Sequence, residues 1–277
     1  MIDTTQVASH YAGNGLKERL IEALDAAGFS RLPVSVQDLA PLDQFHTRGL
    51  AATVDLARAA GIAAEDAVLD VGSGLGGPSR YLAATYGCTV KGIDLSPAFV
   101  EAAEHLAERA GLADKVSYTA GNALALPFAD GSFDVAWTQH VAMNIADRDR
   151  LYAEIHRVLR PGGRLAAYDV VVGSGETLYF PVPWSRMPET SFVMEPSAMR
   201  SMLEHQGFIV QNWTDRTAEG VAWFEQQRAA RAQAAAQPQR FGLHLAMGPD
   251  FQGMTVNLAR NLSEGRARVI EAVLVRT

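Results

Sequence analysis

The stretch from Val68 to Gly77, VLDVGSGLGG, constrains the fold of this chain more than any other. A short apolar run contains an acidic residue near its end and leads into a glycine-rich turn, which predicts a buried strand followed by a helix. Glycine has no Cβ and adopts positive φ, so Gly72, Gly74 and Gly76 leave room for a ligand against the backbone. With Gly77, the turn also fits G-x-G-x-x-G, the dinucleotide-binding fingerprint, so the turn alone leaves the ligand open.

Strand and helix patterns alternate after residue 66. The predicted buried strands are Val68–Val71, Thr89–Ile93, Val116–Thr119, Phe133–Thr138 and Arg164–Val172. Helices are predicted between them, over Pro78–Tyr86 and from the Ser96-Pro97 pair, an N-cap followed by proline at the first helical position, to about Ala110. Apolar strands separated by helices predict a parallel sheet that is covered on both faces.

The segments on either side of this region predict further helices and a pair of strands at one edge of the sheet. Helices are expected over residues 16–28 and about 47–60, from Pro196 to Gly207, and over residues 219–236 and 255–263. Residues 173–194 hold three prolines and four aromatic residues and predict irregular structure. Phe208–Trp213 and Arg268–Val275 are expected to pair at one edge. The predicted fold is α/β: a doubly wound, Rossmann-like sheet of about seven strands with an antiparallel last strand, plus a helical cap.

Composition excludes several classes of protein. A formal net charge of −7 argues against a nucleic-acid-binding surface, which needs clustered Lys and Arg. No apolar run approaches a membrane span, and the first residues lack the pattern of a signal peptide, so we expect a cytoplasmic protein with no membrane partner. Cys88 is the single cysteine, which excludes an intramolecular disulfide and a multi-cysteine metal site; no metal is expected.

Asp94 suits either cofactor, and three blocks that follow it in fixed order distinguish between the two cofactors. Asp94 ends the second strand, where a carboxylate can accept both ribose hydroxyls of a nucleoside. Gly121-Asn122-Ala123 ends the third strand, L-P-F-x-D-x-S-F-D covers residues 126–134, and R-V-L-R-P-G-G covers residues 157–163. Together with the glycine loop, over about Asp66 to Val172, they resemble the class I S-adenosylmethionine-dependent methyltransferases of the small-molecule, type 11 branch. The last two blocks disfavour a hydride-transferring dehydrogenase.

The resemblance implies roles for the residues that line the cofactor, S-adenosylmethionine. Asp70 and the loop of Gly72, Gly74 and Gly76 are expected at its methionine end, with Tyr11 from the N-terminal segment over the methionine carboxylate. The remaining implied contacts are Asp94 on the ribose, Leu95 on the adenine, Asn122 and Ala123 at the adenine edge, and Gln139 near the sulfonium. Asn122 departs from the acidic residue that is usual there, but its amide can both accept from and donate to adenine.

The resemblance implies that the segment after the fourth strand, Gln139 to Ile145, forms the acceptor side of the site. His140 is the candidate for acceptor chemistry, as a general base or as an orienting hydrogen-bond partner. His46, in the PLDQFH stretch, is the second catalytic candidate, at a place where this family builds a lid. Further acceptor contacts are expected from Met143, Asn144, Trp184 and His244. The pairing of PLDQFH with HVAMNI most resembles sarcosine/dimethylglycine N-methyltransferase-like enzymes.

The expected organisation is one methyltransferase domain over residues 1–277. It comprises an N-terminal helical lid over 1–60, a cofactor-binding core over 66–172 and an acceptor-binding cap over 173–265. The expected reaction is methyl transfer to N, O or S of a small-molecule acceptor by a monomer or homodimer. Two alternatives stay open: C-methylation of a natural-product precursor, and a catalytically silent S-adenosylmethionine-binding module. Arsenite methylation would require several cysteines and is excluded.

Overall fold

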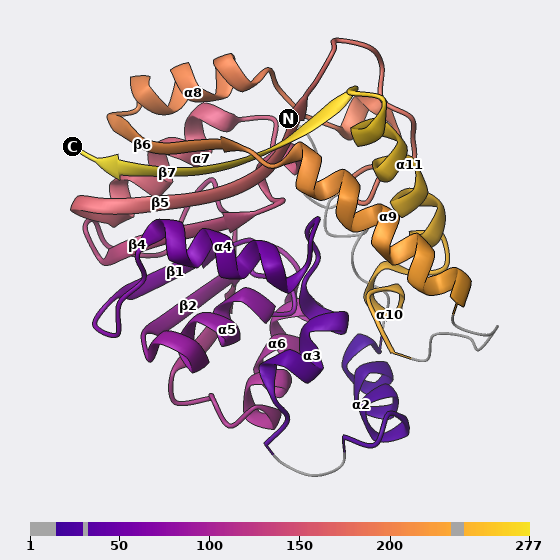
Figure 1. Cartoon of the computed structure of the whole chain (residues 1–277). Helices are drawn as coiled ribbons and strands as arrows, with labels where there is room; N and C mark the ends of the chain where they lie inside the picture. The colour runs from indigo at the N-terminus through magenta and orange to yellow at the C-terminus, as the bar shows by residue number, and fades with distance from the viewer. Residues whose placement is uncertain (1–14, 30–32, 234–240) are drawn as a thin grey trace.

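The computed structural model describes residues 15–29, 33–233 and 241–277. A seven-stranded sheet runs through the centre in the order β3-β2-β1-β4-β5-β7-β6 (Figure 1). The strands are β1 Ala67–Val71, β2 Thr89–Asp94, β3 Val116–Ala120, β4 Phe133–Gln139, β5 Leu159–Val172, β6 Phe208–Asp215 and β7 Ala267–Arg276. The first five are mutually parallel, and β7 is antiparallel to both of its neighbours. The predicted fold class and the pairing of the last two strands are confirmed.

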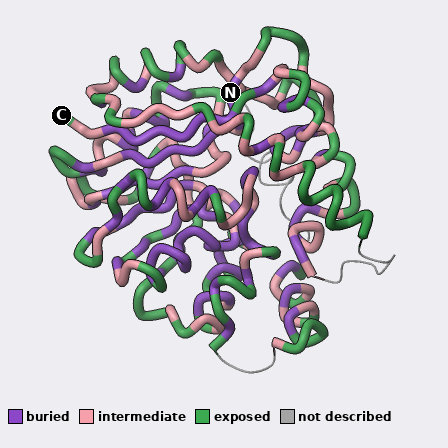
Figure 2. The backbone as a smooth tube through the Cα atoms, in the orientation of Figure 1, coloured by how far each residue is buried: buried purple, intermediate pink, exposed green. Residues whose placement is uncertain are grey.

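Helices cover both faces of the sheet. One face carries α4 Leu50–Ala60, α5 Gly77–Tyr86 and α6 Pro97–Arg109, and the other carries α7 Arg148–Val158 and α8 Pro196–His205. The central strands are buried on both faces (Figure 2) because each apolar strand residue meets one of these helix layers. The predicted cap of Ser96 is confirmed, since its side chain accepts from Phe99 N.

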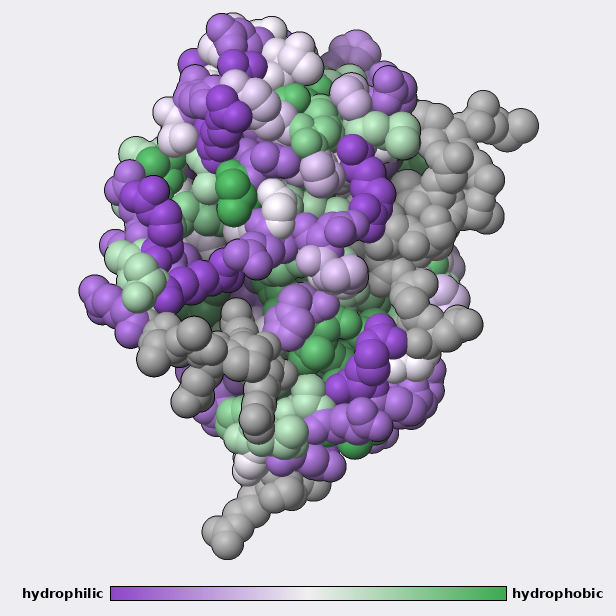
Figure 3. Space-filling view, turned by 90° about the vertical axis from the view of Figure 1, so that its right-hand side faces the viewer, coloured by the Kyte–Doolittle hydropathy of each residue, from purple (hydrophilic) through white to green (hydrophobic). Residues whose placement is uncertain are grey.

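The remaining helices lie beside the sheet. These are α2 Leu16–Ala26, α3 Val36–Asp43, α9 Thr217–Gln233, α10 His244–Met247 and α11 Phe251–Ser263, with short 3₁₀ turns η1 Ala142–Asn144 and η2 Pro188–Thr190. Helix α2 packs on α6 and α10, and α9 packs on α11 and β7. On the side shown in Figure 3, hydrophobic residues lie in a hollow bordered by hydrophilic ones.

Several element boundaries differ from the sequence-based expectation. Helix α3 was not among the predicted helices, and it contains Pro41, a residue that is unusual inside a helix. The helix expected from Thr47 begins at Leu50, after Arg48 and Gly49 adopt positive φ. Strand β5 begins at Leu159 instead of Arg164, but its pairing with β4 shifts between Phe133 and Val135, and regular pairing resumes at Arg164. The intervening residues, which include Gly162 at φ 77°, form an irregularity within the strand.

Candidate active site

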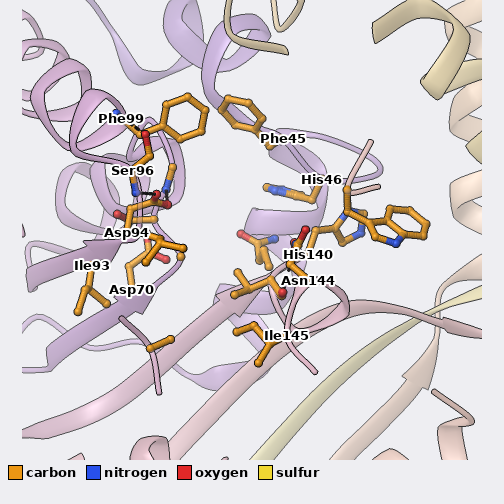
Figure 4. A pocket seen from close by; sticks show the side chains of 18 of the residues that line it. Phe45, His46, Asp70, Ile93, Asp94, Ser96, Phe99, His140, Asn144 and Ile145 are labelled. Carbon is orange, nitrogen blue, oxygen red and sulfur yellow. Dashed lines mark hydrogen bonds between the residues drawn. The ribbon is translucent and has the colours of Figure 1, made fainter. Parts of the chain in front are cut away.

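A cavity of about 550 Å³ lies at the carboxyl ends of β1, β2 and β4. This is the edge where open α/β sheets bind ligands, because the turns that follow the strands gather there. Carboxylates and histidines lie on opposite sides of it: Asp70 and Asp94 on one, His46 and His140 on the other (Figure 4). Phe45, Pro183, Trp184 and Met247 complete the wall from segments that are distant in sequence.

The glycine loop begins at the end of β1 and turns into α5. Gly72, Gly74 and Gly76 all have positive φ, as the sequence predicts for this turn. Gly72 and Gly74 line the cavity. Gly76 does not line it, and its carbonyl instead accepts from the Tyr118 hydroxyl at 3.3 Å. A Cβ on Gly76 would lie 2.2 Å from that hydroxyl oxygen, so this glycine is required by packing behind the loop.

Asp94 joins the loop to the start of α6. Its Oδ2 accepts from Gly74 N at 2.8 Å, and its Oδ1 accepts from Ser96 N at 2.9 Å. Each carboxylate oxygen can accept a second hydrogen bond, so both stay available to the hydroxyls of a ribose. Burial raises the pKa of Asp94, while the hydrogen bonds from Ser96 and Gly74 oppose the increase.

Asp70 lies on the cavity wall beneath the glycine loop. It is 2% exposed, and its Oδ2 accepts from Ser79 Oγ at 2.5 Å. Burial raises the pKa of Asp70 to about 7; the Ser79 hydrogen bond acts in the opposite direction, and the charge of Asp94 adds to the increase. A positively charged ligand beside this carboxylate would therefore stabilise its ionised form.

The predicted adenine-side residues Leu95, Asn122 and Ala123 all line the cavity. The Asn122 side chain has a local partner that the sequence does not reveal. Its Oδ1 accepts from Leu124 N at 2.9 Å and closes a short turn after β3. An amide oxygen carries two lone pairs, so this bond leaves one acceptor position for an adenine amino group.

His140 follows β4 and lines the opposite side of the cavity at φ 56°. Its backbone is held in the turn by two contacts: its N–H donates to Tyr168 O at 2.8 Å, and the next residue's N–H donates to Asp169 Oδ1 at 3.1 Å. Its ring stacks on Tyr168 with centroids 5.6 Å apart and an interplanar angle of 10°. Among the described residues its Nε2 has no hydrogen-bond partner.

His46 packs beside His140 with ring centroids 6.1 Å apart. Its Nε2 lies 3.0 Å from Gly49 O and 3.1 Å from Thr53 Oγ1. Because a carbonyl only accepts, the contact with Gly49 assigns the imidazole proton to Nε2, and burial lowers the pKa of His46 to about 3. The catalytic role predicted for His46 is therefore restricted to its Nδ1 atom.

Burial also lowers the pKa of His140 well below its ordinary value, and the neighbouring His46 adds to the effect. His140 is therefore a neutral imidazole near pH 7, with an unpartnered ring nitrogen beside the cavity. Gln139 lies next to it and accepts from Trp137 Nε1 at 2.9 Å, while its own Nε2 has no partner within the described ranges. Both side chains line the cavity, so they can meet a ligand on this side.

The other predicted acceptor residues divide into two groups. Asn144 and Trp184 line the cavity, and the Trp184 indole N–H donates to Ser191 Oγ at 2.9 Å. Met143 and His244 do not line it: Met143 is fully buried in the core, and His244 is half-buried on α10, where Met247 reaches the cavity instead. Tyr11 lies outside the described residues.

Sequence reasoning missed Asp43 and Phe45, which line the cavity from the end of α3 and the residues after it. The signal was present, because both belong to the PLDQFH stretch that contains His46. It also missed Pro183 and Met247, for which no local motif exists. Within residues 15–29, 33–233 and 241–277, no group of three or more His, Cys, Asp or Glu side chains is placed to hold a metal ion. Over the same ranges, no helix has the length and apolar character of a membrane span.

Comparison with known proteins shows which class of enzyme this chain is similar to. Residues 69–167 match the family described as methyltransferase domain. The chain is 41% identical over 140 residues to methyltransferase GfsG of Streptomyces halstedii, a match that covers 50% of this chain and 48% of that protein. It is 35% identical over 133 residues to glycine/sarcosine/dimethylglycine N-methyltransferase of Actinopolyspora halophila, covering 48% and 22% respectively. These matches span less than half the length of either relative.

The fold is similar to that of solved methyltransferases over nearly the whole chain. Geranyl diphosphate C-methyltransferase from Streptomyces coelicolor A3(2), solved with Mg²⁺, geranyl diphosphate and S-adenosyl-L-homocysteine, superimposes with a TM-score of 0.71 at 17% identity. The match covers 99% of this chain and 97% of that one. Residues 69–167 therefore form a methyltransferase domain, the whole chain has the fold of solved methyltransferases, and the resemblance seen in its sequence is confirmed.

Proposed function

We propose that this chain transfers the methyl group of S-adenosylmethionine to a nitrogen or oxygen atom, or to sulfur, of a small acceptor with a largely apolar body. One observation carries the proposal: a single cavity joins the glycine loop and its carboxylates to the imidazole of His140. A cofactor held at the first side would direct its methyl group toward the second.

The cofactor side fits S-adenosylmethionine. Asp94 has acceptor positions left for the ribose hydroxyls, and Gly74 leaves the loop backbone open, since a Cβ there would approach nothing closer than the Phe45 ring at 3.8 Å. When bound, the cofactor supplies a methyl group on a sulfonium whose leaving group is neutral. Positioning of the acceptor and exclusion of water can then provide most of the acceleration.

The acceptor side fits a nucleophile that arrives with a proton. An ammonium must lose a proton to gain the lone pair that attacks the methyl group, and a hydroxyl becomes a strong nucleophile only as its proton is removed. His140 lines the cavity as a neutral imidazole, and the imidazole nitrogen that carries no proton can accept that proton as the methyl group is transferred. The adjacent Gln139 amide can donate to a second polar atom of the acceptor.

The charges of the cavity narrow the acceptor class. Among the described residues that line it, no Lys or Arg is present, whereas Asp43, Asp70, Asp94 and Asp147 are. A phosphate or diphosphate acceptor needs cationic partners, so the lining favours an uncharged or amine-bearing acceptor. Phe45, Trp184 and Met247 would contact its apolar body.

The experiment is methylation of a panel of amines, phenols, alcohols and thiols with isotopically labelled S-adenosylmethionine. At saturating cofactor we expect His140→Ala to lower turnover about 10²- to 10⁴-fold, the usual contribution of a general base. Cofactor affinity should stay close to that of the wild type. His205→Ala, on the exposed end of α8, is the matched histidine control and should retain full turnover.

Other outcomes of this experiment would assign a different function to the chain. If His140→Ala turns over at the wild-type rate across the pH range, His140 is not the base. Methyl groups found on carbon would indicate C-methylation of an alkene or enol. Tight binding of S-adenosylhomocysteine with no methylated product over the whole panel would favour the catalytically silent module.

A further inference from the structure

Asp43 is a buried carboxylate on the cavity wall with one oxygen in use and one free. It ends α3, is 2% exposed, and its Oδ2 accepts from Arg80 Nη2 at 2.7 Å. Its Oδ1 is buried and has no hydrogen-bond partner in the described part of the chain. A buried acceptor without a partner is costly, so a group that binds in the cavity and donates to Oδ1 would be stabilised there.

The position of Asp43 relative to the glycine loop is closely fixed. A Cβ on Gly77, the first residue of α5, would lie 2.6 Å from Asp43 Oδ1 and 2.4 Å from its carbonyl oxygen. Arg80 is fully buried one turn further along α5 and also donates to Ala103 O at 3.3 Å. The carboxylate is therefore held at the end of the glycine loop, where the methionine part of the cofactor is expected.

The other two carboxylates at this end of the cavity have different hydrogen-bond partners. Asp70 accepts from Ser79, and both oxygens of Asp94 accept from backbone N–H groups. Of the carboxylate oxygens of these three residues, only Asp43 Oδ1 is both shielded from solvent and without a hydrogen-bond partner among the described residues. Although burial raises its pKa to about 6, with Arg80 opposing the increase, it is still largely ionised at neutral pH.

We infer that Asp43 is a cofactor-binding residue whose Oδ1 accepts from the α-ammonium group of the methionine part of S-adenosylmethionine. This inference rests on the proposed function. The carboxylate would then lie between two cations, the Arg80 guanidinium on one oxygen and the ammonium on the other, an arrangement that its four acceptor positions allow. Arg80 acts through Asp43 as a positioning residue, because its guanidinium is buried behind the carboxylate.

The test uses three ligands that differ in the amino-acid part: S-adenosylhomocysteine, its analogue without the amino group, and 5′-methylthioadenosine. By calorimetry, we expect the wild type to bind S-adenosylhomocysteine about 10- to 100-fold more tightly than the deaminated analogue, the range for a charge-assisted hydrogen bond. Asp43→Asn should abolish this preference and bind 5′-methylthioadenosine within about twofold of the wild type. Asp38→Asn, on the exposed side of α3, is the matched control and should keep the preference.

Two results would overturn the assignment. One is equal binding of S-adenosylhomocysteine and its deaminated analogue by the wild type, a measurement that needs no variant to fold. The other is a loss of affinity for all three ligands in Asp43→Asn, which indicates a structural role. If no adenosine ligand binds the wild type, the proposed function itself fails. If Asp43→Asn does not fold, Asp43→Glu is the second variant, because it keeps the charge but moves the carboxylate. An unchanged preference for the amino group in Asp43→Glu would also argue against the contact.

Discussion

The three loop glycines adopt similar backbone conformations for different reasons. A Cβ on Gly76 would lie 2.2 Å from the Tyr118 hydroxyl oxygen, and one on Gly72 would lie 2.6 Å from a methyl carbon of Val141. Gly74 is different, because a Cβ there would meet only Phe45, at 3.8 Å. Two glycines are therefore required by packing against neighbouring side chains, and the third leaves space in the cavity.

This difference predicts unequal costs of substitution. Gly74→Ala should lower the free energy of unfolding by about 1–2 kcal/mol, the cost of a left-handed conformation for an L-residue. Gly76→Ala adds overpacking against the buried Tyr118 ring and should cost a further ~1–3 kcal/mol. Urea denaturation measures both values. Equal losses in the two variants would show that the ring moves aside without cost.

At the level of secondary structure elements, one arginine joins the sheet edge to α9. Arg216 follows β6 and donates to Glu271 of β7 at 3.0 Å and to Glu219 of α9 at 3.0 Å. Glu271 is fully buried, whereas the Glu219 side chain is 41% exposed. The arginine thus neutralises a carboxylate inside the sheet and at the same time fixes the start of the helix.

The two ion pairs should differ sharply in their contributions. Arg216→Met leaves Glu271 buried without its cation and is expected to cost about 3–5 kcal/mol of unfolding free energy. Glu219→Gln removes only an exposed partner and should cost ~1 kcal/mol or less. The double variant Arg216→Met/Glu271→Met should recover much of the loss, as measured by denaturation. A double variant as unstable as Arg216→Met would rule out the uncompensated charge as the cause.

At the scale of the whole molecule, the cavity gathers buried acids beside the expected position of a cation. Burial raises the pKa of Asp70 to about 7 and that of Asp43 to about 6, so the free protein holds part of these protons at pH 6.5. S-adenosylmethionine carries a net positive charge, and a cation favours the ionised form of a carboxyl. Binding should therefore release protons.

Calorimetry in buffers with different ionisation enthalpies measures this release. At pH 6.5 we expect S-adenosylmethionine binding to release a substantial fraction of a proton, and at pH 8 almost none, because both carboxyls are then already ionised. Asp70→Asn should reduce the release at pH 6.5. Proton uptake at pH 6.5, or the same release at both pH values, would contradict the prediction.

Much of the fold was readable from the sequence because it depends on short-range interactions. The strand after residue 66, the positive-φ glycines and the Ser96 cap each follow from sterics and hydrogen bonds within a few residues. The antiparallel pairing of β6 with β7 was also predicted, from two apolar runs separated by helices. The sequence also determined that Asp70, Asp94 and His140 would lie at the ends of strands on one edge of the sheet. The reason is that parallel strands place their carboxyl ends together.

Only the tertiary structure decided which side chains of the irregular segments reach the cavity. Met143 and Asn144 are adjacent in η1, yet the first is buried in the core and the second lines the cavity. Likewise Met247, not His244, reaches it from α10. His46 has its Nε2 bound by Gly49 and Thr53, and Asp43 has an oxygen left free by Arg80. Outside regular strands and long helices no fixed period sets the direction of a side chain, so contacts with residues distant in the sequence determine it.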